Sequence, residues 1–319
     1  MNVFTHSIVV PVYRNEVTLP ALLGQIAALQ PRINGTLEVV FVIDGSPDNS
    51  YALLKTQLPS MPFQSQLISL SRNFGSFAAI RSGLEAARGR YFAFLAADLQ
   101  QPVSSVEAFF RLLEGGADIA VGQRANRDDP LLSRWASAAF WAFYRRFVQR
   151  DVPPGGVDAF GCTRDVRDIL IALPEANTTL VGLLLWVGFK REFVAYPRGA
   201  RPSGRSGWTL ARKLRYAFDS VFAFSDLPIT MMVVAGIGGT AAAAIASIIV
   251  LVAWSAGSIR VPGYTALMLA LLWSVSIILL ALGVIGGYLW RVFENTKGRP
   301  SHLVRSVEIV EPSRAQELR

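Results

Sequence analysis

The sequence predicts an α/β protein with a doubly wound, mostly parallel sheet, followed by an interfacial helix and a pair of long apolar helices. Short apolar runs alternate with helical segments between residues 7 and 121, which is typical of a sheet covered by helices on both faces. Two later segments, 229–254 and 265–290, are each 26 residues long and contain no charged side chain. The first observation predicts the sheet, and the second predicts a hairpin of helices.

Short, mostly apolar runs bounded by turn residues predict the strands, because strands buried on both faces lack regular polar alternation. The helices between them follow from apolar positions at helical spacing, with Thr18 placed to cap the first. Ser104 and Glu107 have the spacing of a capping box, and Gly115 and Gly116 stop that helix. The predicted strands are 7–12, 37–43, 66–70, 90–97 and 117–121, with one more at 306–310, and the predicted helices include 18–29, 77–88 and 104–114.

Polar loops follow the first four predicted strands, at residues 11–16, 44–50, 71–76 and 98–102. The carboxyl ends of parallel strands meet at one edge of a sheet, where open α/β sheets bind ligands. Asp98 is a candidate ligand there, although a strand-end Asp can also simply cap a turn. Neither G-x-G-x-x-G nor G-x-x-x-x-G-K-[ST] occurs, which disfavours a dinucleotide site and a P-loop. An Asp near an amide oxygen can instead hold a divalent cation that binds a diphosphate.

The two uncharged segments exceed the roughly 20 residues that a membrane span needs. A buried helical hairpin in a soluble protein is the disfavoured alternative. Flanks 208–227 and 291–310 carry seven Lys and Arg residues against one in the connecting loop, which predicts cytoplasmic flanks and a multi-pass protein of the cell (inner) membrane. The N-terminus lacks a signal-peptide pattern. The expected organisation is a catalytic domain at 1–200, an interfacial region at 201–228, a transmembrane hairpin at 229–290 and a basic tail at 291–319.

The net charge of +8 suits contact with anionic lipid. Nucleic acid is the competing interpretation of a basic chain, and it is disfavoured because the basic residues flank the apolar segments. The single cysteine, Cys162, excludes an internal disulfide and fits a reducing compartment. The aromatic-rich segment 134–147 is interpreted either as a helix packed on the sheet or as a wall of an acceptor site facing the membrane.

Four sequence elements together resemble the family 2 glycosyltransferases: VPVYRNE at 10–16, DGSPD at 44–48, SRNFG at 71–75 and ADLQQP at 97–102. The branch most similar in these elements is the polyprenyl-phosphate sugar transferases, which include dolichol-phosphate mannose synthase and bacterial undecaprenyl-phosphate glucosyltransferases. The resemblance continues through GQR at 122–124, FGCTR at 160–164, and KGRP at 297–300. It covers nearly the whole chain.

The resemblance implies a GT-A fold and transfer of one sugar from a nucleotide-sugar to a polyprenyl phosphate, usually with inversion. It also implies a role for each matching residue. The nucleotide-binding positions are Pro11, Tyr13, Glu16, Asp44, Asn73 and Gly75; the metal ligands for Mg²⁺ or Mn²⁺ are Asp98 and Gln100; the acceptor-phosphate positions are Arg124, Arg134, Ser137, Arg201 and Ser206; and the catalytic set is Asp98, Arg124, Arg134 and Asp158.

The chain departs from the family pattern at several of these elements. Ala96 replaces the first Asp of D-x-D, which removes one charged oxygen ligand from the metal site. Gln101 stands where an acid is usual, Gly161 where an arginine is usual, and Gly207 where a lysine is usual. A processive polysaccharide synthase is disfavoured, because the Q-x-x-R-W acceptor motif is absent.

Two functions therefore remain at the level of the sequence. The leading hypothesis is a membrane-bound glycosyltransferase for cell-envelope glycans. The alternative is a catalytically silent relative that binds nucleotide or lipid carrier as a scaffold, which Ala96 favours. The expected partners are a nucleotide-sugar, a polyprenyl phosphate and the membrane, with no nucleic acid; a homo-oligomer stays open.

Overall fold

The computed structural model describes residues 4–124, 142, 144–146, 157, 159–173, 179–197, 218–219, 221–225, 227–256 and 263–312. Within these residues, eight strands form one mixed sheet in the order β7-β5-β6-β4-β1-β2-β3-β8. The strands are β1 (His6–Val12), β2 (Leu37–Ile43), β3 (Gln64–Leu70), β4 (Tyr91–Phe94), β5 (Ile119–Arg124), β6 (Ala159–Thr163), β7 (Arg191–Tyr196) and β8 (Val304–Val310). The predicted α/β sheet is therefore confirmed.

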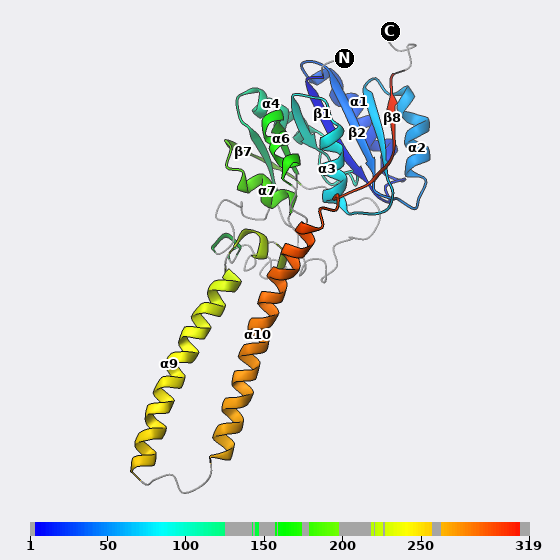
Figure 1. Cartoon of the computed structure of the whole chain (residues 1–319). Coiled ribbons are helices and arrows are strands. Elements are labelled where there is room, and N and C mark those ends of the chain that lie inside the picture. The colour runs from blue at the N-terminus through cyan, green and yellow to red at the C-terminus, as the bar shows by residue number, and fades with distance from the viewer. Residues whose placement is uncertain are drawn as a thin grey trace.

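Helices cover both faces of this sheet (Figure 1). One face carries α1 (Leu19–Leu29), α2 (Ser50–Gln57) and α4 (Ser104–Glu114), whose apolar side chains share one buried cluster with β1 and β2. The other face carries α3 (Ser76–Ala86), α6 (Arg164–Ala172) and α7 (Leu180–Trp186), which build a second cluster. Every residue of β2 is buried, including the charged Glu38 at its second position.

The structure differs from the prediction in the length of β4, in two further strands and at the start of α4. β4 ends at Phe94, three residues before the predicted end. β6 and β7 were not predicted, and β6 runs antiparallel to both β4 and β5. The capping box is wrong, because Ser104 is already inside α4 and its side chain makes no capping hydrogen bond; Glu107 pairs instead with Arg111 at 2.8 Å.

The predicted strand at 306–310 is confirmed as β8, which pairs antiparallel with β3 at the edge of the sheet. β8 also contacts α2, because Glu308 accepts hydrogen bonds from Tyr51 and from Lys55. The end of the described chain is thus part of the sheet, next to elements formed by its first 70 residues (Figure 1).

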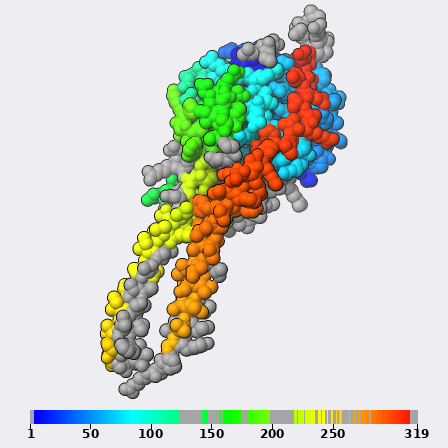
Figure 2. Space-filling model, viewed as in Figure 1, coloured from blue at the N-terminus to red at the C-terminus, as the bar shows by residue number. Residues whose placement is uncertain are grey.

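Two long helices, α9 (Leu227–Ser255) and α10 (Tyr264–Thr296), extend away from the sheet as a narrow stalk (Figures 1 and 2). In the part of the chain that the structure describes, no helix meets the combined requirement of length and apolarity for crossing a membrane. The predicted transmembrane hairpin therefore gains no support from the structure. Most of the predicted interfacial region 201–228 lies outside the described residues.

Candidate functional site

The four polar loops predicted from the sequence follow β1, β2, β3 and β4, which are neighbours in the sheet. All four strands are parallel, so these loops lie side by side at one edge. From β1 the chain adds β2 and then β3 on one side of β1. It then crosses over and adds β4 on the other side. The gap between the ends of β1 and β4 is therefore the topological switch point at which open α/β sheets bind ligands.

Pro11 explains how β1 and β4 separate at this point. The Leu95 N–H bonds to the Val9 carbonyl, and the Asp44 N–H bonds to the Val12 carbonyl. The backbone N–H and C=O groups of residues 9 and 11 therefore point toward β4, whereas those of residue 12 point toward β2. Proline has no N–H, and Pro11 would face a strand that has already ended at Phe94. A central strand thus tolerates this proline, and the chain after β4 is free to turn toward the site.

The loop after β1 is fastened to the loop after β2 by backbone N–H groups. The Arg14 N–H donates to Ser46 Oγ at 2.7 Å, and the Glu16 N–H donates to Asp48 Oδ2 at 3.1 Å. In return, Glu16 accepts from the Asn49 N–H at 3.1 Å. Glu16 therefore shapes these loops. The Tyr13 side chain remains 41% exposed, which leaves its ring accessible to a ligand.

Asp44 joins the loop after β2 to the 71–75 loop. Its carboxylate accepts from the Phe74 N–H at 2.7 Å and from the Gly75 N–H at 2.9 Å, while Asn73 Nδ2 donates to the Asp44 carbonyl at 3.2 Å. The side chain is only 3% exposed. Burial raises the pKa of Asp44 above its usual value, although the two N–H donors and Arg72 act in the opposite direction.

Gly45 lets these two loops approach closely. Its φ is +58°, and a Cβ at this position would overlap the backbone of Arg72 and Asn73. No residue with a Cβ fits both the left-handed conformation and the space. Asp44, Asn73 and Gly75, which are predicted nucleotide-binding positions, are therefore brought together with the loops of Tyr13 and Glu16, as the sequence predicted for a shared edge.

Asp98 and Gln100 occupy a single tight turn after β4. The Gln100 N–H donates to Asp98 Oδ1 at 3.2 Å, and Leu99 between them has a φ of +59°. Left-handed backbone is unusual for leucine and indicates a conformation imposed by its surroundings. Both polar side chains are half-buried at the edge of the sheet.

Two buried polar residues that the sequence did not identify as site residues hold this turn. Thr18 Oγ1 donates to the Ala97 carbonyl at 2.6 Å, so the start of α1 is tied to the loop after β4. Gln101 is 4% exposed; its amide donates to the Phe94 carbonyl and to Ser105 Oγ, and accepts from the Ala96 N–H. The glutamine that departs from the family pattern is thus a structural support. The sequence signal for this role of Gln101 was its position directly after Gln100, in the same loop as Asp98.

The described residues contain no group of three or more His, Cys, Asp and Glu side chains arranged to hold a metal ion. Mg²⁺ is commonly held by one or two carboxylates together with substrate phosphates and water. One carboxylate and one amide on the same turn fit that pattern. Asp98 and Gln100 therefore stay a predicted ligand pair.

The predicted acceptor residues are less completely described. The backbone of Arg124 is at the carboxyl end of β5, opposite Tyr196 of β7, and so lies at the same edge as the four loops. Arg134, Ser137, Asp158, Arg201 and Ser206 lie outside the described residues.

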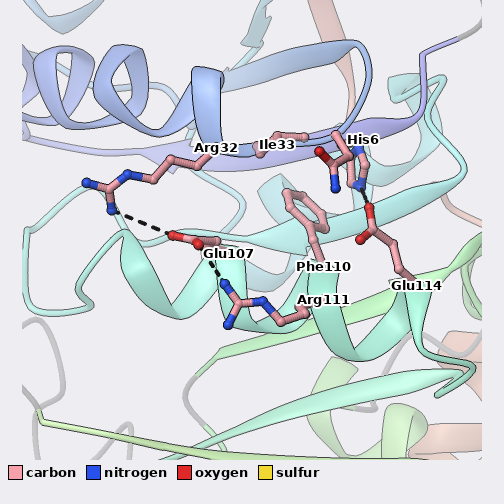
Figure 3. Close-up of a pocket in the computed structure, with 8 residues that line it drawn as sticks. His6, Arg32, Ile33, Glu107, Phe110, Arg111 and Glu114 are labelled. Carbon is pink, nitrogen blue, oxygen red and sulfur yellow. Dashed lines mark hydrogen bonds and ion pairs between the residues drawn. The ribbon is translucent and has the colours of Figure 1, made fainter.

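A cavity of about 150 Å³ opens at the opposite edge of the sheet, where β1 begins and α4 ends (Figure 3). Its His6 is buried and contacts Glu114 at 2.9 Å, while Arg32 and Arg111 flank Glu107. Burial lowers the pKa of His6 despite the carboxylate of Glu114. The first residue of β1 and the loop that ends it are on opposite edges, so this cavity is separate from the candidate site.

Comparisons with known proteins agree with this arrangement. A family model described as "Glycosyl transferase family 2" matches residues 7–166, which include the four loops. An uncharacterized glycosyltransferase of Synechocystis sp. is 32% identical over 93% of this chain and 94% of its own length. The chain belongs to glycosyl transferase family 2. This member is a glycosyltransferase, and the part that the family model matches contains its β1–β4 loops.

Other relatives carry more informative names. The putative glycosyltransferase CsbB of Bacillus subtilis is 30% identical over 95% of this chain and 92% of its own. A bactoprenol glucosyl transferase of Shigella phage SfV is 27% identical over 94% of this chain and 98% of its own. Among solved structures, glucosyl-3-phosphoglycerate synthase of Mycobacterium tuberculosis in complex with UDP aligns at 20% identity with a TM-score of 0.45, covering 67% of this chain and 76% of that one.

Proposed function

We propose that this glycosyltransferase moves one sugar from a nucleotide-sugar to a polyprenyl phosphate at the cytoplasmic face of a cell membrane. The observation that carries the proposal is the assembly of the 13–16, 44–49, 71–75 and 97–101 loops at the switch point of the sheet. The full-length match to a bactoprenol glucosyl transferase supports the choice of acceptor.

The donor would lie across the loops after β1, β2 and β3. The exposed ring of Tyr13 offers a stacking surface for a base, and Asp44 and Asn73 fix the loop that borders it. Asp98 and Gln100 would hold Mg²⁺ or Mn²⁺, which would supply Lewis-acid stabilisation of the diphosphate leaving group. Solved relatives in fold are described as complexes with UDP and either Mn²⁺ or Mg²⁺.

A lipid phosphate is an acceptor that needs little activation. Its second pKa is about 6, so an oxygen is already largely ionised at neutral pH. The protein must instead hold the dianion in line with the anomeric carbon, and guanidinium groups fork onto phosphate oxygens. We assign this role to Arg124 and Arg134, with Ser137, Arg201 and Ser206 as further contacts. Asp158 would be a general base only if the acceptor were a hydroxyl.

The stalk of α9 and α10 would bring the site to the membrane. The segments 229–254 and 265–290 are uncharged, and many of their large apolar side chains are exposed in the isolated chain. Such a surface is expected to be covered in the cell, and a bilayer is the partner that a lipid acceptor implies.

The decisive experiment is mass spectrometry of lipid products after incubating the purified protein and undecaprenyl phosphate with a panel of nucleotide-sugars and Mg²⁺. We expect one sugar to be added to the lipid phosphate. The matched control is Asp98→Asn, which removes the charge but keeps the size of the side chain. Absence of product with every donor would overturn the proposal.

Ala96 favours a second candidate function, a scaffold that binds nucleotide or lipid carrier without turnover. The same experiment separates the two when nucleotide binding is measured in parallel. Binding of a nucleotide together with failure of all donors to react would support the scaffold.

A further inference from the structure

The last turn of α10 is followed by a glycine in the left-handed conformation. Gly298 has a φ of +57°, and its N–H bonds to the Asn295 carbonyl at 3.3 Å, which is the arrangement expected where a left-handed glycine ends a helix. The chain then runs through 299–303 to β8. We call residues 297–303 the strap, because they connect the stalk to the sheet.

The strap docks at the edge of the sheet that carries the candidate site. His302 Nε2 lies 3.3 Å from Glu85 Oε2 of α3, and the His302 side chain is only 10% exposed. The next residue, Leu303, accepts a hydrogen bond from the Ser71 N–H at 2.9 Å. Burial would raise the pKa of Glu85, but His302 and Arg81 outweigh it and lower that pKa, so the carboxylate is ionised at neutral pH.

Ser71 is the first residue of the 71–75 loop, and the same loop is held at its other end by Asp44. The Asp44 carboxylate accepts the N–H groups of Phe74 and Gly75, and Gly45 packs against the backbone between these points. The loop is thus supported from β2 on one side and from the strap on the other. Helix α3, which begins at Ser76 directly after the loop, carries the Glu85 that holds His302.

We propose that the strap is a positioning element for the 71–75 loop, with Gly298 setting its direction and His302 fixing it to α3. The stalk and the donor loop are therefore mechanically connected through seven residues. This inference rests on the proposed function for its meaning in catalysis, because the 71–75 loop borders the donor. The connection itself is tested independently of activity.

Gly298 offers a clean probe, because a Cβ added there would meet no atom within 4 Å. A substitution at this position therefore tests backbone conformation alone. Gly298→Val disfavours the left-handed conformation, whereas Gly298→Asn tolerates it and is the conservative rescue. Gly283→Val is the matched control, since this helical glycine of α10 has the same open surroundings without a positive φ. His302→Ala removes the contact between the strap and Glu85 of α3. It tests the same inference if Gly298→Val fails to fold.

Hydrogen–deuterium exchange of the full-length protein in detergent is the primary measurement. In Gly298→Val and His302→Ala we expect faster exchange of the Ser71, Phe74 and Gly75 amides, with unchanged exchange in the 13–16 and 98–101 loops. Gly298→Asn and Gly283→Val should match the wild-type protein. Equal protection of the 71–75 loop in all variants would overturn the inference, as would a uniform loss of protection across all three loops.

Binding of UDP, GDP and TDP, measured by calorimetry, links the strap to the donor. Where wild type binds one of these, the two disruptive variants should bind it up to about tenfold more weakly, the loss expected when one hydrogen bond is removed. In transfer assays the KM for the donor should rise while the KM for the lipid acceptor stays constant. If the wild-type protein binds none of the three nucleotides, the result counts against the proposed function. The exchange data would still decide the role of the strap.

Discussion

Single residues at the candidate site divide into those that shape the loops and those that are predicted to bind a ligand. Asp44 and Glu16 accept backbone N–H groups of neighbouring loops, so their carboxylates are committed to architecture. Asp98 differs, because it is a predicted cation ligand whose half-buried carboxylate accepts the Gln100 N–H at the edge of the sheet. The charge of Asp98 is therefore expected to matter for chemistry more than for folding.

Asp98→Asn should abolish sugar transfer with little change in the thermal unfolding temperature. The amide keeps the hydrogen bond to the Gln100 N–H but loses the charge that a divalent cation requires. Ala96→Asp, which restores a second carboxylate, should lower the Mg²⁺ or Mn²⁺ concentration needed for half-maximal rate. Transfer rates across a metal titration measure both effects, and full activity of Asp98→Asn in chelator would refute the metal role.

The Cys162 thiol should be unreactive in the folded protein. It is fully buried in β6, and burial raises its pKa to about 12, so the reactive thiolate is negligible at pH 8. Ellman's reagent at pH 8 should detect no thiol in the native protein and one thiol per chain after denaturation. Rapid reaction of the native protein would mean that β6 opens readily.

The sequence predicted which residues gather at the site better than it predicted what each of them contacts. Strand-end position was enough to bring Tyr13, Asp44 and Asp98 to one edge, because parallel strands share their carboxyl ends. The supporting contacts of Thr18 and Gln101 reach the Ala97 and Phe94 carbonyls from other elements. Such contacts depend on the three-dimensional packing, which the pattern of residue types does not encode locally.

At the scale of elements, two helical glycines should respond to the same substitution in opposite ways. A Cβ on Gly83 of α3 would overlap the Val9 side chain and lie 3.1 Å from Val42 Cγ2, whereas a Cβ on Gly24 of α1 would meet nothing within 4 Å. Gly83→Ala should destabilise the protein by about 1–3 kcal/mol through overpacking against β1. Gly24→Ala should stabilise it by about 0.5–1 kcal/mol through helix propensity.

Chemical denaturation of the two variants in a detergent-solubilised sample gives both free energies of unfolding. A stabilising effect of Gly83→Ala would mean that α3 does not pack on β1 as closely as described.

Strand length and direction were the weakest element-scale predictions. The strand predicted at 90–97 was too long, because its apolar residues continue past Phe94: Leu95 and Ala97 are buried in the same cluster as α1 after the ladder has ended. The apolar residues therefore predicted correctly that this segment is buried, but they did not predict where β4 ends. β6 was missed because its five residues, AFGCT, include a glycine and form no long apolar run. A Cβ on Gly161 would lie 3.0 Å from the Phe92 carbonyl oxygen, a tight contact that glycine avoids.

At the scale of the whole molecule, β7 and β8 lie at opposite edges of the sheet while the stalk connects them in sequence. A chain shortened after residue 198 therefore loses β8 and exposes β3. Seven strand spacings separate β7 from β8, roughly 34 Å. A flexible linker of about 40 residues has a root-mean-square length that matches this distance.

We expect a chain in which such a linker replaces residues 201–300 to be monodisperse in buffer without detergent and to bind nucleotide. The chain shortened after residue 198 should aggregate, because β3 would present a row of unpaired backbone N–H and C=O groups to other chains. Size-exclusion chromatography and thermal unfolding compare the two. Equal solubility and stability would show that β8 contributes nothing to the sheet, and retention of the linked form on membranes after a salt wash would contradict the role proposed for the stalk.

The pairing of β8 with β3 also has a consequence for biosynthesis. Tyr51 and Glu308, which join in the finished fold, are 257 positions apart along the chain. A ribosome adding 5–20 residues per second needs roughly 13–50 s to make the intervening stretch. Throughout that time the edge of β3 has no neighbour, and the two apolar helices emerge before the strand that covers it. The nascent chain should therefore depend on a chaperone, or on prompt delivery to the membrane, more strongly than a protein whose sheet closes as it is made.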